Sequence, residues 1–585
     1  MSDEQGAGVY RQWLQDDRVE PELRAELQSL EAQGMVDELR DRFAGDLEFG
    51  TGGLRARMGA GTNRMNVHTV RKASAGVARW ICAGFADGQR RLVIGYDGRR
   101  QSAQFAEDTA RVAAFYGVTS YLFPAARPTP LLSFAVRHLG CSAGIMVTAS
   151  HNPPEYNGYK VYGADGCQVL PDGAAVIVRE MESVGDVLAV PLLSKADAAQ
   201  SGLLHTVGPD VEAAYRAALT VLHRDLGAGV KDQLRIVYTP LHGTGGALVP
   251  SALAAAGFAN VHVVKQQANL DSEFTHVASP NPEEAKAYDL ALALAHELAQ
   301  TPGEAPDVLL ATDPDADRVG VMARDASGQY VPLSGNDIGG LVLADYLPYL
   351  QATGTLGADA TVVTTHVTSD FGEAVARSYG ADTVRTLTGF KYIGEQIARY
   401  EASGSRSFVF GYEESVGYLA KPFVRDKDSV QAVLLIAQMA AAVKARSSTL
   451  PDALLDLFAK HGYYRDRLLS FTFEGQTGHV RMQKLMAALR EDPLTVSGQE
   501  PLSVEDTLEG VRRYPDKTSE PLDLPQADVL KHVFVGGAWI AVRPSGTEPK
   551  LKAYLGVCEA GDRAATERLD AMEAALRTRL ASYLQ

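Results

Sequence analysis

A serine that follows a short apolar segment is the first residue of the sequence that could carry a reaction. Gly144–Val147 has the composition of a short buried strand, and it ends where Thr148-Ala149-Ser150-His151-Asn152-Pro153 begins. Because Asn152-Pro153-Pro154 cannot continue a strand, we expect Ser150 to lie on a stiff turn at the end of a sheet. A hydroxyl in that position could act as a nucleophile or carry a phosphoryl group. The six residues taken alone are also compatible with an ordinary turn.

Three aspartates alternate with small residues in Asp313-Pro314-Asp315-Ala316-Asp317, directly after the predicted strand 307–311. Residues two apart in an extended segment point the same way, so the three carboxylates are expected to converge. Three negative charges are costly to bring together without a cation, and oxygen ligands without His or Cys favour Mg²⁺ over Zn²⁺. A solvated acidic turn is the alternative. The register of the acids at a strand end, followed by Arg318, favours a metal site.

Two further loops carry residues that could bind ligand groups. Arg543-Pro544-Ser545-Gly546-Thr547 combines a guanidinium, two hydroxyls and a glycine N–H, which match the donors that a phosphate group needs. Its composition is also common in turns. Glu413, Glu414 and Ser415 follow a predicted strand and could bind sugar hydroxyls, or equally form the N-cap of a helix.

Lys160 is predicted at the start of the strand after the serine loop. It could act as a general acid or base if its pKa falls, although most lysines at strand starts are only solvated. Gly243-Thr-Gly-Gly246 lacks the third glycine and the acidic partner of a dinucleotide-binding loop. We therefore do not predict a dinucleotide cofactor.

The strands that must position these residues recur in three rounds. In each round a strand, a helix and a second strand precede a strand that ends in a polar loop. Helices alternating with short apolar strands predict α/β layers, and open α/β sheets carry ligand chemistry at strand ends. We therefore expect three similar mixed α/β domains around a central cleft. The predicted strands are 91–96, 118–123, 144–147, 234–238, 261–264, 307–311, 361–364, 383–387 and 407–410, and the helices 102–116, 246–256 and 370–378.

The two ends of the chain differ from these rounds. Residues 1–45 are predicted to form an amphipathic helical lead-in. Segments 533–535 and 538–542 flank Gly536-Gly537, a hairpin signal, and strand 551–555 and helix 561–583 follow, so we expect a smaller C-terminal α+β domain. Polar, turn-forming stretches predict linkers at 194–208, 323–332 and 461–465. The predicted domains are 1–205, 206–325, 326–462 and 463–585.

The composition is that of an ordinary globular protein, with 46% hydrophobic and 22% charged residues among 585. The formal net charge of −16 argues against a general nucleic-acid binder. Four scattered cysteines without metal-ligand spacing fit a reducing cytosol. No signal peptide is apparent. The longest apolar stretch, 433–443, is too short to span a bilayer and predicts a core helix. We expect a cytoplasmic protein without membrane or nucleic-acid partners.

Four loops, taken together, resemble the signature loops of the α-D-phosphohexomutase superfamily, in the family's order and across essentially the whole chain. They are Thr148–Pro153, Asp313–Arg318, Gly411–Ser415 and Arg543–Thr547. Segment 48–64 is most similar to the branch that contains bacterial phosphoglucomutases and the phosphoglucomutase-2/phosphopentomutase group. The resemblance implies an isomerase-class phosphosugar mutase.

The resemblance also implies a role for each matching residue. Ser150 would be the phosphoserine, and its phosphate would join Asp313, Asp315 and Asp317 in holding Mg²⁺. Lys160 would be the general acid/base and Arg318 would steady the transferring group, with His151 and Arg55 also in the active site. The substrate-binding residues would be Glu413 and Ser415 for the sugar hydroxyls, Thr388, Gly389 and Lys391 for the sugar's orientation, and Arg543, Ser545, Gly546 and Thr547 for the non-reacting phosphate.

The function implied first is phosphoglucomutase activity, which interconverts glucose 1-phosphate and glucose 6-phosphate through a phosphoserine enzyme. Glucose 1,6-bisphosphate would be the intermediate and activator. Alternatives with the same mechanism are phosphopentomutase and phosphomannomutase activity. A glucose-1,6-bisphosphate synthase and a non-catalytic sugar-phosphate sensor are further alternatives, and the intact serine, aspartates and lysine argue against the sensor. We expect a small phosphosugar as the partner, bound by a monomer or small homo-oligomer.

Overall fold

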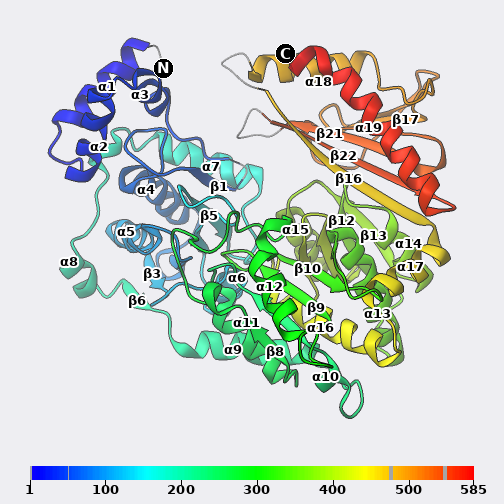
Figure 1. The fold of residues 1–585 in the computed structure, drawn as a ribbon. Helices are drawn as coiled ribbons and strands as arrows, with labels where there is room; N and C mark the ends of the chain where they lie inside the picture. The colour runs from blue at the N-terminus through cyan, green and yellow to red at the C-terminus, as the bar shows by residue number, and fades with distance from the viewer. Residues whose placement is uncertain (1–2, 51, 474–477, 545–549, 585) are drawn as a thin grey trace. The chain divides into compact units, whose positions relative to one another are not determined.

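The computed structural model describes residues 3–50, 52–473, 478–544 and 550–584 (Figure 1). The chain divides into two compact units. Unit 1 comprises Met1–Ser334, Ile393–Gly404 and Ser415–Ser447. Unit 2 comprises Gly335–Tyr392, Ser405–Glu414 and Ser448–Gln585. The chain therefore passes from one unit to the other several times, and the units do not follow one another along the sequence.

The first sheet of unit 1 has the strand order β1-β5-β4-β2-β3-β6. Strands β4, β2, β3 and β6 run parallel, whereas β5 is antiparallel to β4 and to β1. The parallel part contains the three strands predicted at 91–96, 118–123 and 144–147, which are confirmed. The strands are β1 (Gly53–Arg57), β2 (Arg91–Tyr96), β3 (Thr119–Leu122), β4 (Ala143–Val147), β5 (Tyr156–Gly163) and β6 (Leu204–Thr206), and the accompanying helices α4 (Val67–Gly84), α5 (Ser102–Phe115), α6 (Thr129–His138) and α7 (Pro171–Glu182).

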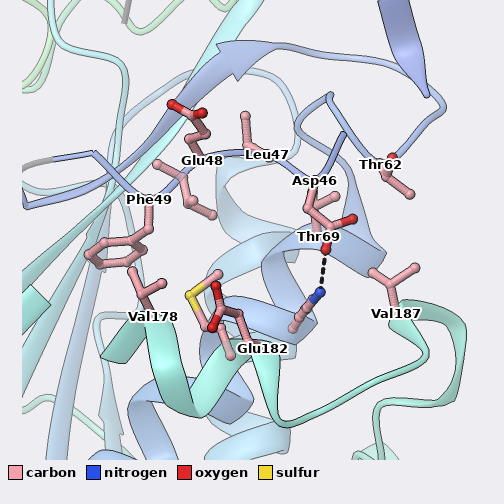
Figure 2. Close-up of a pocket in the computed structure, with 12 residues that line it drawn as sticks. Asp46, Leu47, Glu48, Phe49, Thr62, Thr69, Val178, Glu182 and Val187 are labelled. Carbon is pink, nitrogen blue, oxygen red and sulfur yellow. Dashed lines mark hydrogen bonds and ion pairs between the residues drawn. The ribbon is translucent and has the colours of Figure 1, made fainter. Parts of the chain in front are cut away.

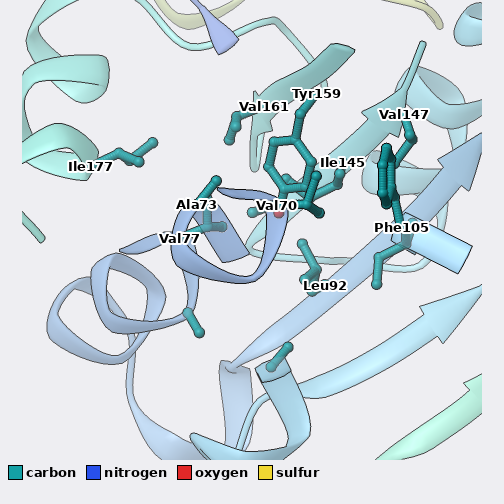
Figure 3. Close-up of a cluster of buried hydrophobic side chains, with 14 of the residues drawn as sticks. Val70, Ala73, Val77, Leu92, Phe105, Ile145, Val147, Tyr159, Val161 and Ile177 are labelled. Atoms are coloured by element: carbon teal, nitrogen blue, oxygen red, sulfur yellow. The ribbon is translucent and has the colours of Figure 1, made fainter. Parts of the chain in front are cut away.

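A hydrophobic core joins this sheet to its helices (Figure 3). Helices α4, α5 and α7 contribute Val70, Phe105 and Ile177, which pack with strand residues such as Ile145 and Tyr159. Because β4 is fully buried, it carries a continuous apolar sequence. The core thereby fixes the end of β4, where Ser150 follows.

The second sheet of unit 1 repeats the parallel pattern with a hairpin at one edge. Its order is β11-β10-β9-β7-β8, with β7 parallel to β8 and β9, and β10 antiparallel to β9 and β11. The long helix α16 (Ser429–Ala445), predicted as a core helix, is buried almost throughout. The other elements are β7 (Ile236–Thr239), β8 (Val261–Val263), β9 (Val308–Thr312), β10 (Val319–Arg324), β11 (Tyr330–Leu333), β15 (Gly417–Leu419), and helices α8 (Lys195–Gln200), α9 (Pro209–Leu219), α10 (Val230–Gln233), α11 (Gly245–Ala255) and α12 (Asp289–Leu298).

The helical lead-in consists of three short helices, α1 (Asp3–Gln15), α2 (Pro21–Ala32) and α3 (Val36–Arg42). Their apolar residues Trp13, Leu27 and Phe43 are buried in one cluster, as the sequence pattern predicts. The loop that follows ends at Asn66, which caps α4: its Oδ1 accepts from His68 N and Thr69 N. The glycine-rich loop, residues 58–66, is tied to the start of α4 because Asn66 also donates to the carbonyl oxygens of Gly59 and Gly61.

Unit 2 contains two sheets. In the first, β12 (Ala360–Thr365) lies between β13 (Asp382–Thr386) and β14 (Ser407–Glu413) and is parallel to both. The second is antiparallel throughout, in the order β16-β22-β21-β20-β17-β18-β19, and its core packs against α18 and α19. Helix α15 (Phe390–Ser403) begins in unit 2, and from Ile393 onward it belongs to unit 1. The remaining elements of unit 2 are α13 (Gly335–Ala352), α14 (Phe371–Ser378), α17 (Leu450–His461), β16 (Tyr463–Thr472), α18 (Gly478–Glu491), β17 (Ser503–Asp506), β18 (Val511–Arg513), β19 (Ser519–Pro521), β20 (Leu530–Val533), β21 (Trp539–Pro544), β22 (Lys550–Glu559) and α19 (Asp562–Leu584).

The stretches predicted as linkers carry regular structure. Segment 194–208 contains α8 and β6, and β6 pairs with β3. Segment 323–332 contains most of the β10–β11 hairpin, and between α17 and β16 only Gly462 intervenes. The hairpin predicted around Gly536-Gly537 exists, but its first strand ends at Val533, earlier than predicted. None of the helices in the part of the chain that the structure describes has both the length and the hydropathy needed to cross a membrane.

Candidate active site

The turn after β4 holds Ser150 in a backbone conformation that residues other than glycine rarely adopt. Ser150 is buried and has a φ of 51°. Its N–H donates to Thr148 Oγ1 (2.8 Å), and the Thr148 hydroxyl donates to Oδ2 of buried Asp97 (2.6 Å). A left-handed conformation fixed by its surroundings is characteristic of functional sites. The stiff turn that the sequence predicts is therefore present.

A buried arginine that the sequence analysis missed fixes the same loop. The guanidinium of Arg99 donates to four backbone carbonyl oxygens of the loop, those of Ser150, Asn152, Pro153 and Tyr156. Irregular buried backbone needs such donors, since no neighbouring strand supplies them. The available signal was Asp97-Gly98-Arg99, two charged residues immediately after an apolar strand.

The three aspartates converge between β9 and β10, although not in the way we predicted. The segment is a tight turn: Ala316 has a φ of 53°, and its N–H donates to Asp313 O (2.9 Å). The predicted extended geometry is therefore wrong. Convergence itself is confirmed, because carboxylate oxygens of Asp313, Asp315 and Asp317 lie within 4.8 Å of one another.

The acidic cluster has the properties of a metal site. All three carboxylates are buried, and among the described residues Asp315 Oδ1 and Asp317 Oδ1 have no hydrogen-bond partner. Burial and the two neighbouring carboxylates raise the pKa of Asp313 well above its ordinary value. Buried oxygens without donors and mutual repulsion both call for a cation, so the residues present fit a hard metal ion.

The serine hydroxyl faces this cluster. Ser150 Oγ donates to Asp313 Oδ2 at 2.6 Å, which joins two loops that are 163 residues apart in the sequence. A phosphoryl group on Oγ would therefore lie beside the acidic cluster. A phosphate oxygen there could complete the ligand shell of a bound metal.

Two lysines balance the charge of the aspartates. Lys160 Nζ donates to Asp315 Oδ2 (2.7 Å) and Asp317 Oδ2 (3.2 Å). Lys427 Nζ, which the sequence analysis missed, forms ion pairs of 3.2 Å with Asp317 and with Asp426. The segment Arg425-Asp-Lys-Asp428 alternates charges just before the apolar helix α16, and that pattern was the available signal.

Lys160 differs from its prediction in two respects. It lies within β5, with its side chain buried, and not at the start of the strand. Burial lowers the pKa of Lys160, but the charges of Asp315 and Asp317 outweigh burial, so the pKa lies above its ordinary value. The condition under which the sequence analysis gave Lys160 an acid/base role, a lowered pKa, is therefore not met.

Three other predicted residues lie at the rim of this group. Arg55, in β1, donates from Nη1 to Asn152 Oδ1 (3.1 Å), and His151 Nδ1 lies 3.4 Å from Ser150 Oγ. The Arg318 guanidinium pairs with Glu283 Oε2 at 3.2 Å and lies 3.9 Å from Asp317 Oδ1. Unit 1 thus brings together every predicted catalytic and metal-binding residue.

The predicted sugar-binding residues fall mainly in unit 2. Glu413 is the last residue of β14, and its Oε1 accepts from the N–H of Gly389 (2.7 Å). Gly389 has a φ of 122°, so a side chain at this position would be strained. Lys391, in the first turn of α15, is buried with Nζ over the Tyr392 ring, and Thr388 precedes the glycine.

The acidic segment around Glu413 does not begin a helix. A turn and then β15 follow it, so the alternative of a helix N-cap is wrong. Glu414 accepts hydrogen bonds from the hydroxyls of Thr365 and Thr368, and burial, with the charge of Glu413, raises the pKa of Glu414 to about 7. Ser415 belongs to unit 1.

Arg543 lies near the end of β21, whereas Ser545, Gly546 and Thr547 are outside the described residues. Burial raises the pKa of Tyr554 in the adjacent strand β22; Glu414 adds to the rise, and Arg543 opposes it. Arg543 and Glu414 therefore each lie within electrostatic reach of Tyr554 inside unit 2.

A separate cavity of about 310 Å³ lies in unit 1, between the segment 46–49 and helices α4 and α7 (Figure 2). Lys72 and Asp46 form an ion pair of 2.6 Å across its lining. The residues that line it include none of the predicted catalytic or metal-binding residues. We therefore assign the chemistry to the group around Ser150.

Four family models of the phosphoglucomutase/phosphomannomutase group match the chain in order. Alpha/beta/alpha domain I matches residues 46–187, domain II 213–328 and domain III 334–460, and the C-terminal domain matches 480–576. The three α/β domains and the distinct C-terminal domain that the sequence predicts are thereby confirmed.

Individual relatives cover most of the chain. A phosphoglucomutase from Staphylococcus haemolyticus (strain JCSC1435) is 39% identical over 515 residues, 88% of this chain and 90% of the relative. One from Staphylococcus epidermidis (strain RP62A) is 38% identical over 530 residues, 90% of this chain and 93% of the relative. Among solved structures, a putative phosphomannomutase from Thermus thermophilus has a TM-score of 0.65 at 23% identity, covering 91% of this chain and 99% of its own. Parafusin, a phosphoglucomutase from Paramecium, has a TM-score of 0.64 at 17% identity, with 92% and 94% covered. These structures share the fold.

Proposed function

The chain belongs to the phosphoglucomutase/phosphomannomutase family, and on this basis we propose that it interconverts glucose 1-phosphate and glucose 6-phosphate. It is an isomerase-class phosphosugar mutase. Relatives that are 37–39% identical over about nine-tenths of the chain are phosphoglucomutases. The observation that carries the mechanism is the 2.6 Å hydrogen bond from Ser150 Oγ to Asp313, which sets a carrier hydroxyl beside the acidic cluster.

We assign Asp313, Asp315 and Asp317, together with the phosphate of phosphorylated Ser150, as ligands of Mg²⁺. The buried, unpartnered oxygens of Asp315 and Asp317 and the all-oxygen donor set support this choice. When bound, the ion would neutralise charge on the transferring phosphoryl group.

The first half of the reaction transfers the phosphoryl group from Ser150 to the sugar. The free hydroxyl of the sugar phosphate attacks phosphorus, the bond from phosphorus to Ser150 Oγ breaks, and a bisphosphate forms. A proton moves overall from the sugar hydroxyl to Ser150 Oγ, and we assign Lys160 to relay it. Arg318, Arg55 and His151 are assigned to the oxygens of the transferring group, where cationic donors stabilise developing charge.

The second half returns a phosphoryl group to the enzyme. Glucose 1,6-bisphosphate turns over, Ser150 Oγ attacks its other phosphorus, and the isomeric monophosphate leaves. The bisphosphate therefore serves as intermediate and activator. For this step the sugar must be held at its hydroxyls, which we assign to Glu413, Ser415, Thr388, Gly389 and Lys391, and at its non-reacting phosphate, which we assign to Arg543, Ser545, Gly546 and Thr547.

We also propose a cytoplasmic location. None of the four cysteines, all of which lie in the described part of the chain, forms a disulfide. Reduced thiols are typical of the cytosol.

The decisive experiment measures kcat/KM on glucose 1-phosphate, ribose 1-phosphate and mannose 1-phosphate, together with intact mass after incubation with glucose 1,6-bisphosphate. We expect a preference for glucose and a gain of one phosphoryl group in the wild type and in Ser183→Ala, an exposed control, but not in Ser150→Ala. A preference for ribose or mannose would replace the substrate assignment. Net accumulation of bisphosphate would indicate a synthase, and binding without turnover a sensor.

A further inference from the structure

A second group of potential metal ligands lies in unit 1, apart from the aspartates. His242, Asp271 and His276 each offer a ligand atom, and these atoms lie within 4.8 Å of one another. His242 follows β7 in the segment Thr239-Pro-Leu-His-Gly243, and the other two belong to the loop after β8. The proposed phosphoryl transfer uses none of them.

The ring of His242 is held in one tautomer. Its Nδ1 lies 3.0 Å from the carbonyl oxygen of Asn269, and because a carbonyl oxygen only accepts, Nδ1 carries the proton. Nε2 therefore has the lone pair and accepts the N–H of His276 at 3.3 Å, a long hydrogen bond that an ion bound at Nε2 would replace. A metal-binding histidine typically has its other ring nitrogen bonded to a carbonyl or carboxylate in this way.

Asp271 is oriented by backbone donors. The N–H groups of Glu273 and Thr275 donate to its two oxygens at 3.0 and 2.9 Å. A carboxylate that already accepts hydrogen bonds is oriented before any metal arrives.

The two imidazoles lie close together with different exposure. The ring centroids of His242 and His276 are 5.5 Å apart, with His242 buried and His276 exposed. A buried, oriented ligand and an exposed one together give an ion a route from solvent to the site. His242 also has a left-handed φ of 61°, a conformation that its surroundings must stabilise.

We propose that His242, Asp271 and His276 form a binding site for a transition-metal ion of the Zn²⁺ class, completed by water. Two nitrogen donors and one carboxylate suit Zn²⁺ or Co²⁺, whereas Mg²⁺ prefers oxygen ligands alone. The site is thus chemically distinct from the aspartate cluster, and the two are expected to select different ions. It does not depend on which phosphosugar the enzyme uses.

The test titrates the full-length protein with Zn²⁺ by calorimetry, and with Co²⁺ by visible absorption, in the presence of saturating Mg²⁺. Magnesium occupies the all-oxygen cluster and leaves the histidine site to be measured. We expect the wild type to bind one ion more than His276→Ala does, with Co²⁺ bands characteristic of nitrogen ligation. Removing this exposed ligand should weaken binding by at least about 10–100-fold, the loss typical of changes next to a metal ligand.

Two further variants make the result specific. Asp271→Asn should also weaken Zn²⁺ binding. His205 is an exposed histidine that stacks on Tyr121, and the variant His205→Ala should bind Zn²⁺ as the wild type does. Circular dichroism checks that each variant is folded. Equal binding by the wild type and His276→Ala, or an equal loss in His205→Ala, would overturn the proposal.

Discussion

At the scale of single residues, the hydroxyl of Ser150 depends on one guanidinium for its position. Arg99 holds the carbonyl oxygens of Ser150, Asn152, Pro153 and Tyr156, and lysine cannot reproduce its forked set of donors. We expect Arg99→Lys to lower kcat on the order of 100-fold, because misplacing a reacting group by about 1 Å has an effect of that size.

The neighbouring Arg100 provides the control for that variant. It is exposed and pairs with Glu273, so Arg100→Lys should leave kcat nearly unchanged. Steady-state kinetics measure kcat for both variants, and thermal unfolding verifies that each is folded. A normal kcat for Arg99→Lys would show that the loop keeps its shape without the guanidinium.

The aspartates give a prediction about metal dependence. Chelation should inactivate the enzyme reversibly, with Mg²⁺ restoring activity. Asp317→Asn removes one charge and one ligand oxygen, so the Mg²⁺ concentration for half-maximal activity should rise by roughly 10–100-fold. Activity is measured against free Mg²⁺ for both proteins. Superimposable curves would exclude Asp317 as a ligand.

These residues also show what could be predicted from the sequence. Ser150 and the three aspartates stand out because each follows an apolar strand with an unusual polar pattern. Arg99 and Lys427 do not, because their importance comes from contacts with residues more than 50 positions away. The tight turn of the aspartates was missed for a related reason: alternation of acids does not reveal the left-handed φ of Ala316.

At the scale of elements, one side chain ties the glycine-rich loop to the start of α4. Asn66 accepts from two helix N–H groups and donates from Nδ2 to Gly59 O (2.9 Å) and Gly61 O (2.8 Å). Asn66→Ala should lower the free energy of unfolding by about 1–2 kcal/mol for the lost cap, and further for the unpaired carbonyls. Urea unfolding of both proteins measures this difference in the free energy of unfolding.

Asn66→Ser separates the two roles. Serine keeps an oxygen that can cap the helix but lacks the amide donors, so its stability should fall between those of the wild type and Asn66→Ala. If Asn66→Ala is as stable as the wild type, the cap contributes nothing measurable.

A buried histidine in β20 predicts a pH dependence of stability. Burial lowers the pKa of His532 to about 4 from 6.5. Between pH 4 and 6.5 the unfolded chain binds a proton on His532 and the folded chain does not. The stability that the neutral, buried His532 contributes is therefore complete above pH 6.5 and is lost as the pH falls towards 4. The loss should be about 3 kcal/mol, at about 1.4 kcal/mol for each pKa unit.

The variant His532→Phe tests this assignment. Phenylalanine fills similar space without titrating. Unfolding is followed by fluorescence between pH 7 and 4. We expect a shallower pH dependence for the variant, and an identical one would assign the acid sensitivity to other groups.

The elements themselves were largely predictable, and their edges were not. Strands such as β2 and β9 and helices such as α5 and α19 match the apolar pattern, because burial imposes that pattern. Short edge strands such as β6 and β11 are only partly buried, so they carry little apolar signal and were predicted as linkers. Helix α15 was missed because its amphipathic pattern begins directly after Thr388-Gly389, which the sequence analysis treated as part of a loop.

At the scale of the whole molecule, a late segment of the chain completes an early unit. Helix α16 contacts α10 and α11, and Gln438 accepts from Arg224 N (2.7 Å) and donates to Leu222 O (3.0 Å). A fragment of residues 1–334 lacks α16 and would expose the apolar surface that the helix covers. We expect it to aggregate, and co-expression of residues 415–447 to raise its soluble yield, measured by size exclusion.

A soluble, monomeric 1–334 fragment that gains nothing from 415–447 would contradict this account.

The division into units could not be predicted from the sequence, which shows domains only in their linear order. The four-part division that we predicted describes that order, and its boundary at 205 falls inside β6. Which segment completes which core depends on pairings and helix contacts between distant parts of the chain.

The position of α16 has a consequence for how the protein is made. A ribosome releases the strands of the second sheet of unit 1 well before the helix that covers them. At about 5–20 residues per second, synthesis of residues 335–447 occupies on the order of 10 s. Throughout that interval the nascent chain carries an uncovered apolar face, which makes it a natural client for chaperones that bind during translation.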